Sequence, residues 1–226
     1  TAEQEVVVAL NASNKETDYA WLTKHAPANV KLVSRFDTHA LFALQGAKAP
    51  DFLKSIGVEL NFDQLYGTKV FQVGGVEAQY FVSGYTGEKG CEISVANKDA
   101  EQLFSFLMDK GAAFGLQPCG LGCRDTLRTE MGYSLYCHEL SLEINPVEAG
   151  LSWAIDFTSS FIGRDALAKY KESPKRKLIA FQNTSSRQAP RSEMKIFDAT
   201  GKECGFVTSG TFSPSLGYVV GLGIVD

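Results

Sequence analysis

A glycine-rich turn and the strand after it carry the first residues suited to chemistry. Residues 84–90 read GYTGEKG and lead into CEISV at residues 91–95. Glycines permit positive φ and a close approach of a ligand to the backbone. Alternation places Glu92 on the strand face opposite to Cys91. Tyr85 offers a ring or hydroxyl and Glu92 two acceptor oxygens, which suits a flat heterocycle with an N–H and amino edge. The alternative is a β-hairpin with a solvated glutamate.

A predicted helix over residues 121–131 carries two arginines four positions apart. Arg124 and Arg128 therefore share a helix face, and Asp125 and Glu130 are close to them in sequence. An arginine buried in such a helix needs a carboxylate partner from the protein or from a ligand. The alternative is two surface arginines in ion pairs along the helix.

The chain has an odd number of cysteines without a dense framework, which predicts reduced thiols in a reducing compartment. They are Cys91, Cys119, Cys123, Cys137 and Cys204. Cys119, Cys123 and the Cys137-His138 pair include metal-ligand types, but their spacing is not the usual C-x2-C. We therefore expect small buried thiols and no metal site.

Composition limits the class of protein. The 226 residues are 44% hydrophobic and 21% charged, as in soluble globular proteins of one or two domains. The net charge of −4 argues against non-specific nucleic-acid binding and against a polybasic membrane surface. No apolar run approaches the length of a membrane span. Residues 1–5 lead directly into VVVAL, so we expect no signal peptide.

The first 62 residues predict a small sheet with helices in a ferredoxin-like order. We expect, in order, a strand over residues 4–10, a turn at 11–14, a helix from Ser13 or Asn14 to about residue 26, strands over 30–33 and 40–44, and a helix from Pro50 to about residue 56. Tyr19 and Leu22 are expected to face inward from the first of these helices.

The middle of the chain predicts further mixed structure, and the end predicts only strands. Gly74-Gly75 forms a two-residue hairpin turn between strands over 71–73 and 76–82. Helices over 98–110 and 161–170 flank the arginine helix, and residues 149–157 predict a core strand with Trp153 inward. Residues 172–177 form a polar link at a domain boundary, and residues from 178 onward predict an all-β region.

Several motifs in a fixed order resemble the aminomethyltransferase (T-protein) family of the glycine cleavage system. They are GYTGExGxEI, GLGxRDTLRxExG, LYxHEL, P-x-EAGL-x-W and FIGR-x-AL. Outside them, residues 11–14 resemble the family's VNASN turn, residues 44–46 its ALQGP segment, and residues 208–216 its TSGTFSPxL run. The resemblance covers nearly the whole chain.

The resemblance implies an α+β fold of ferredoxin-like (split βαβ) folate-binding domains followed by part of a β-barrel domain. Residues 1–62 are expected to belong to the central ferredoxin-like domain, 63–172 to the first folate-binding domain and 173–226 to the C-terminal barrel. T-proteins have further segments on both sides of the matching region. We therefore expect this chain to be an internal fragment or a product of truncation.

The activity implied is transfer of a methylene group from an aminomethyl group on the lipoyl arm of H-protein to tetrahydrofolate, with release of ammonia. The folate-binding residues implied are Glu92 for the pterin N–H and amino edge, Tyr85, Arg124, Tyr133 and Asn11, the last with a helix cap as its alternative. The family's acidic catalytic residue falls upstream of Thr1, and a substrate-site arginine falls beyond Asp226. No catalytic residue is therefore assigned. The sequence also departs from the family at two places. Cys91 stands where the family typically has a phenylalanine, and the arginine that the family usually has just before the GYTG turn is absent.

Three other functions remain open at this point. One is a related tetrahydrofolate-dependent demethylase, and another is a folate-binding factor for iron–sulfur maintenance, whose KGC motif is matched only by residues 89–91. The third is a catalytically inactive folate-binding fragment. The expected partner is lipoylated H-protein, with no nucleic acid and no membrane. The expected compartment is the bacterial cytoplasm, with the mitochondrial matrix as the alternative.

Overall fold

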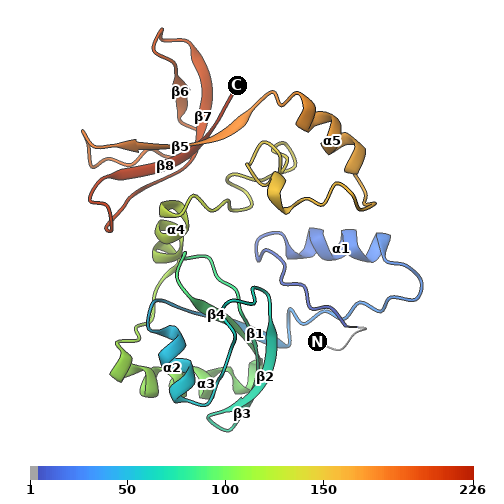
Figure 1. The fold of residues 1–226 in the computed structure, drawn as a ribbon. Helices are drawn as coiled ribbons and strands as arrows, with labels where there is room; N and C mark the ends of the chain where they lie inside the picture. Colours follow the sequence, from blue (N-terminus) through green and yellow to red (C-terminus); the bar gives the residue numbers. More distant parts are fainter. Residues whose placement is uncertain (1–4) are drawn as a thin grey trace. The chain divides into compact units, whose positions relative to one another are not determined.

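The structure is a computed structural model that describes residues 5–226. The chain folds into two compact units, one ending at Gly120 and one running from Leu121 to Asp226. Each unit contains a four-stranded antiparallel sheet together with helices (Figure 1). The predicted α+β class is confirmed.

The sheet of the first unit has the strand order β1-β4-β3-β2. Its strands are β1 (His39–Gln45), β2 (Thr68–Val73), β3 (Val76–Phe81) and β4 (Gly90–Ala96). Gly74 and Gly75 join β2 to β3 with φ values of 60° and 78°. Two successive positive φ angles suit a tight hairpin turn and glycine alone adopts both without strain. The predicted hairpin is confirmed.

One face of this sheet forms the core of the first unit. Cys91, Ile93 and Val95 of β4 point into it and are almost completely buried. Helix α2 (Ala49–Ser55) adds Phe52 and Leu53 to the same cluster, and α3 (Asn97–Gly111) covers it with further leucines. Full burial of one such aliphatic side chain contributes about 1.5–3 kcal/mol, so this face stabilises the unit.

The opposite face of the sheet carries the alternate residues of every strand. Strand pairing aligns them in two cross-strand rows, Leu41–Ser94–Gln79–Val70 and Ala43–Glu92–Phe81–Thr68. Leu41 and Val70 are each more than half exposed on this face. The register therefore places Glu92 on the open face, beside Ala43 and Phe81.

Two strands predicted near the start of the chain are wrong. Residue 4 lies outside the described residues, and residues 5–10 and 30–33 form no strand. Val6, Val8, Val30 and Val33 are all exposed. A β-branched run becomes a strand only where it finds a ladder partner and a face to cover, and these runs have neither in the described part of the chain.

Helix α1 (Lys15–His25) forms where it was predicted, but it buries none of its residues. Tyr19 does turn inward and packs edge-on against Phe36, with 5.6 Å between ring centres. Leu22, also expected to face inward, is exposed. Charged and other polar residues fill most of the helix, so only a narrow stripe is available for packing.

The second unit begins with α4 (Leu121–Glu130) and ends in the second sheet. After α5 (Arg164–Glu172) come β5 (Lys177–Asn183), β6 (Lys195–Phe197), β7 (Glu203–Phe212) and β8 (Val219–Val225), in the order β5-β8-β7-β6. This sheet is open, as part of a barrel should be, and the all-β prediction for this region is confirmed. Two short 3-10 turns complete the described elements: Ala112–Phe114 in the first unit and Ser152–Ala154 in the second.

The predicted strand over residues 149–157 is wrong. This stretch contains the 3-10 turn at Ser152–Ala154, and Trp153 is 78% exposed instead of pointing inward. Gly150 adopts a φ of 73°, which breaks any extended run at its start. The large apolar side chain of Trp153 indicated a buried strand, although the stretch lacks the alternation of apolar and polar residues that a half-buried strand needs.

The three-part domain division stays a prediction. The expected boundary after residue 62 lies between β1 and β4, which pair along their full length in one sheet. No helix among residues 5–226 is both long and apolar enough to cross a membrane.

Among residues 5–226, one buried side chain in the core of the first unit has a polar atom without a hydrogen-bond partner. Tyr80 is completely buried, and its hydroxyl makes no hydrogen bond. Burial raises its pKa, with the nearby Cys91 thiol adding to the effect. We expect Tyr80→Phe to increase the free energy of unfolding by about 1 kcal/mol, because it removes an unsatisfied buried hydroxyl. Urea denaturation tests this, and a loss of stability on substitution would show that the hydroxyl is bonded.

Candidate functional site

Glu92 lies near the start of β4, half-buried on the open face of the first sheet. The hydroxyl of Ser83, two residues beyond the end of β3, donates a 2.7 Å hydrogen bond to its Oε2. The two residues are the first and last polar side chains around the glycine-rich turn. The carboxylate is therefore held in one orientation at the point where the turn re-enters the sheet.

The fixed carboxylate has the acceptor capacity for a flat, two-donor ligand edge. A carboxylate offers about four lone-pair sites, and the Ser83 bond uses one of them. Two parallel N–H groups from a ligand can approach such a group bidentately. Phe81 is the cross-strand neighbour of Glu92 and adds a half-buried aromatic side chain to the same face.

Tyr85 is half-buried in the turn that leads to Glu92. Within the turn, the Thr86 hydroxyl accepts a hydrogen bond from the Glu88 N–H at 3.3 Å. Near the end of the turn, the Lys89 carbonyl accepts a hydrogen bond from the Gly46 N–H at 3.0 Å. Tyr85 and Glu92 thus lie in one turn-and-strand segment, and ligand binding by these two residues stays a prediction.

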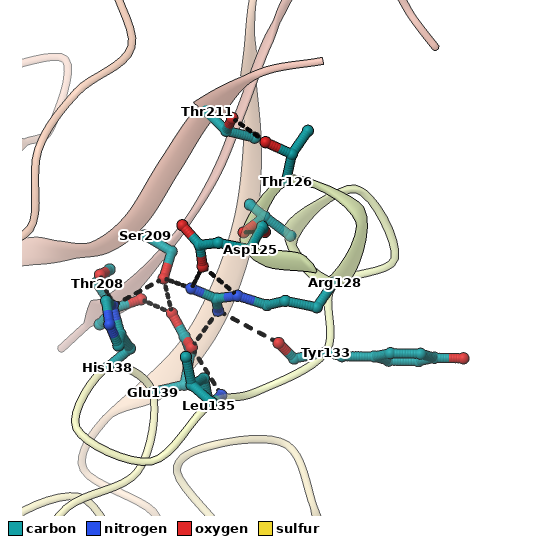
Figure 2. Close-up of polar contacts among 11 residues, drawn as sticks. Asp125, Thr126, Arg128, Tyr133, Leu135, His138, Glu139, Thr208, Ser209 and Thr211 are labelled. Carbon is teal, nitrogen blue, oxygen red and sulfur yellow. Dashed lines mark hydrogen bonds and ion pairs between the residues drawn. The ribbon is translucent and has the colours of Figure 1, made fainter. Parts of the chain in front are cut away.

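In the second unit, Arg128 is the centre of a buried polar cluster (Figure 2). Its side chain is 1% exposed, and both Nε and Nη2 donate to Asp125 Oδ1, at 2.8 and 2.6 Å. Nη1 donates to Glu139 Oε2 at 2.7 Å, and Nη2 also donates to the Ser209 hydroxyl at 2.7 Å. The cluster therefore joins α4 to the segment before residue 140 and to β7.

Glu139 is completely buried and its carboxylate is fully engaged. The hydroxyls of Thr208 and Ser209 each donate to Oε1 at 2.6 Å, and the Leu135 N–H donates to Oε2 at 3.0 Å. Adjacent residues of a regular strand point to opposite faces, but the register of β7 shifts between Val207 and Ser209. This β-bulge lets two successive hydroxyls reach one carboxylate.

The sequence predicted that a buried arginine in α4 would have a carboxylate partner, and Arg128 is that residue. Its two carboxylate partners, Asp125 and Glu139, both come from the protein. Arg124, the arginine implied by the resemblance, is exposed one turn earlier on α4. The structure therefore separates a structural arginine from an accessible one, and ligand binding by Arg124 stays a prediction.

Tyr133 is attached to the cluster through its backbone. Its N–H donates to the Arg128 carbonyl at 2.9 Å, and its own carbonyl accepts from Arg128 Nη1 at 3.3 Å. Figure 2 shows its ring pointing away from the cluster, and the residue is 40% exposed. Arg128 thus fixes the backbone of Tyr133 while the ring remains accessible.

Asn11 forms a local turn before α1. Its Oδ1 accepts from the Ser13 N–H at 3.3 Å and from the Ser13 hydroxyl at 2.9 Å. The N-cap of α1 is Asn14, and no side chain caps that helix end. The cap that was the alternative for Asn11 is therefore absent, and its contact with a folate stays a prediction.

Of the five cysteines, only one is deeply buried. Cys91 lies in the core, where burial and the neighbouring Glu92 charge raise its thiol pKa to about 12. Cys119, Cys123 and Cys137 are exposed, so the prediction of small buried thiols is wrong for these three. Among the described residues, no group of three or more His, Cys, Asp or Glu side chains is arranged to hold a metal ion.

Two family models match nearly the whole chain. The GCVT N-terminal domain matches residues 1–159, and the glycine cleavage T-protein C-terminal barrel domain matches residues 176–226. This chain belongs to the glycine cleavage T-protein family. The resemblance found in its motifs is confirmed.

Relatives of this T-protein chain are longer than it is. The aminomethyltransferase of Chlorobaculum parvum is 42% identical over 219 residues, covering 94% of the chain and 59% of that relative. That of Flavobacterium psychrophilum is 37% identical, covering 99% of the chain and 63% of the relative. The crystal structure of glycine cleavage system aminomethyltransferase T from Bartonella henselae matches with a TM-score of 0.81 at 29% identity, covering 96% of the chain and 59% of that protein. The chain thus spans about three fifths of their length.

Ser83, whose hydroxyl bonds the Glu92 carboxylate, was missed from the sequence. A serine near the end of a strand gives no distinctive signal by itself. A usable signal lay in Gly84 and Gly90, because glycines that frame a turn mark places where another group approaches the backbone.

The Arg128 cluster makes a stability prediction for the second unit. Glu139→Ala removes the completely buried carboxylate partner of Arg128 and leaves the buried arginine charge less compensated. We therefore expect a loss of about 3–5 kcal/mol in the free energy of unfolding. Asp165→Ala is the matched control, since it breaks the solvent-exposed Arg164–Asp165 pair and should cost under about 1 kcal/mol. Urea denaturation measures both, and equal losses would contradict the central role of Glu139.

Proposed function

We propose that this chain is the pterin-holding part of an aminomethyltransferase. The proposed reaction transfers the methylene of an H-protein lipoyl-bound aminomethyl group to tetrahydrofolate and releases ammonia. The observation that carries the proposal is the Glu92 carboxylate, fixed by Ser83 on an open sheet face beside a turn with a tyrosine. The printed names of the relatives, aminomethyltransferases, support it.

In this proposal the protein's residues bind and orient the folate. Glu92 accepts the ring N–H and 2-amino group of the pterin, and Tyr85 lines the same pocket. Arg124, Tyr133 and Asn11 are proposed as further folate contacts on the strength of the family resemblance. Tetrahydrofolate supplies the reacting nitrogens, so the task of these residues is to hold the ring in a productive position.

The proposed partner is lipoylated H-protein, and the proposed compartment is the bacterial cytoplasm, as the relatives named above are bacterial. No nucleic acid or membrane is part of the proposal. A tetrahydrofolate-dependent demethylase remains the second candidate, because the residues around Glu92 recognise a pterin whatever the donor. The donor is what separates the two.

The pterin proposal predicts a folate-binding defect in one carboxylate variant. We expect the chain to bind tetrahydrofolate with micromolar affinity, and Glu92→Gln to weaken it at least about tenfold, because a charge-assisted bond is worth about 1.5–3 kcal/mol. Calorimetric titration measures the affinities. Glu88→Gln is the control, since it neutralises an exposed carboxylate in the same turn and should leave binding unchanged.

Two results would count against this proposal. Equal weakening by both glutamine variants would mean that net charge, and not the position of Glu92, attracts the ligand. Absence of tetrahydrofolate binding in the unaltered chain would mean that these residues do not form a pterin site in this chain.

The donor is tested separately. The aminomethyltransferase proposal predicts methylene transfer to tetrahydrofolate from aminomethylated H-protein and no methyl transfer from methylated amines. Mass spectrometry of the folate products distinguishes the two. Transfer from a methylated amine alone would support the demethylase instead.

A further inference from the structure

We propose that Gln45 is the positioning residue that holds the pterin-binding turn in shape. This inference rests on the proposed function, because it assigns Gln45 a role at the site proposed for Glu92. Gln45 is the last residue of β1 and is half-buried. Its cross-strand partner is Gly90, the first residue of β4.

The side-chain amide of Gln45 bonds both arms of the turn. Nε2 donates to the Ser83 carbonyl at 3.0 Å and to the Cys91 carbonyl at 3.1 Å. Oε1 accepts from the Thr86 hydroxyl at 3.4 Å. One amide group therefore links the residue that enters the turn, a residue inside it and the residue that leaves it.

The two carbonyls that Gln45 binds adjoin the proposed ligand site. Cys91 directly precedes Glu92, and Ser83 is the residue whose hydroxyl holds the Glu92 carboxylate. Fixing both carbonyls fixes the separation between the Ser83 hydroxyl and the start of β4. The orientation of Glu92 therefore depends on Gln45 without any contact between the two side chains.

The two glycines at the ends of the turn, Gly84 and Gly90, leave room for the Gln45 side-chain amide. A Cβ atom added at Gly84 would lie 2.0 Å from Gln45 Oε1, and one added at Gly90 would lie 2.6 Å from Gln45 Cδ. Neither approach is possible for a residue with a side chain. The path of the Gln45 side chain thus requires a glycine at position 84, whereas at Gly90 the Leu44 backbone carbonyl, 2.5 Å from an added Cβ, excludes a side chain as well.

A solvated surface glutamine would look different. Such a side chain has no need of two carbonyl acceptors from segments eight residues apart, nor of glycines on either side. Two bonds from one side-chain amide contribute about 1 kcal/mol each, which is enough to bias a glycine-rich turn toward one conformation. The physical role of Gln45 is to reduce the conformational freedom of the turn before ligand arrives.

The test compares Gln45→Met with Gln102→Met in the full chain. Methionine has a similar length and cannot bond the carbonyls. Gln102 is a matched glutamine of the same unit whose Nε2 donates to a single turn carbonyl, that of Gly74, at 2.9 Å. Two readouts are taken for each variant: hydrogen exchange of the amides of residues 84–91 without ligand, and the dissociation constant for tetrahydrofolate.

We expect Gln45→Met to speed exchange in this segment about tenfold or more and to weaken tetrahydrofolate binding by a similar factor. Gln102→Met should change neither. Unchanged exchange in Gln45→Met would overturn the inference, and so would faster exchange with unchanged affinity. Absence of binding by the unaltered chain would overturn the proposed function and the ligand half of this inference, while exchange would still report whether Gln45 holds the turn.

Substitution of the two glycines tests the inference independently. Gly84→Ala should speed exchange in the unaltered chain but add little to Gln45→Ala, because the three atoms nearest to the added methyl group all belong to the Gln45 amide. Gly90→Ala should damage both backgrounds equally, since its Cβ would also lie 2.5 Å from the Leu44 backbone carbonyl. Additive effects for Gly84→Ala would contradict the proposed path of the Gln45 side chain.

Discussion

Strand β4 supplies side chains to both faces of the first sheet, and the position of Glu92 depends on this alternation. Its period of two sends Cys91, Ile93 and Val95 into the core and Glu92 to the open face. A shift of one residue in register would bury the carboxylate and expose the core residues. The buried face therefore fixes where the chemical group stands. The polar contacts around the turn then fix how it is oriented.

The two units hold their polar groups by different means. In the first, a few hydrogen bonds among Gln45, Ser83 and Glu92 shape the glycine-rich turn. In the second, a desolvated network around Arg128 and Glu139 joins a helix, an irregular segment and a bulged strand. A buried ion pair of this kind is costly to break and adds little net stability over an apolar core. Its value here is that it fixes the backbone of Tyr133.

The sequence predicted what local pattern determines. The Gly74-Gly75 hairpin, the alternation of β4 and the helices around residues 97–111 and 121–130 follow from turn chemistry and periodicity, as does the all-β end of the chain. The strands expected near residues 5–10 and 149–157 failed because pairing partners and chain reversals are not encoded in an apolar run. Ser83 and Gln45 could not be assigned as site residues, since their roles arise from contacts across 9 and 38 to 46 positions.

The most direct measurement compares tetrahydrofolate with an analogue that lacks the pterin 2-amino group, in the unaltered chain and in Glu92→Ala. In the proposed site that amino group bonds the Glu92 carboxylate. We therefore expect the analogue to bind the unaltered chain about tenfold or more weakly than tetrahydrofolate, and the two ligands to bind Glu92→Ala equally. The same loss of affinity in both proteins would contradict this role of Glu92, because the amino group would then be recognised elsewhere.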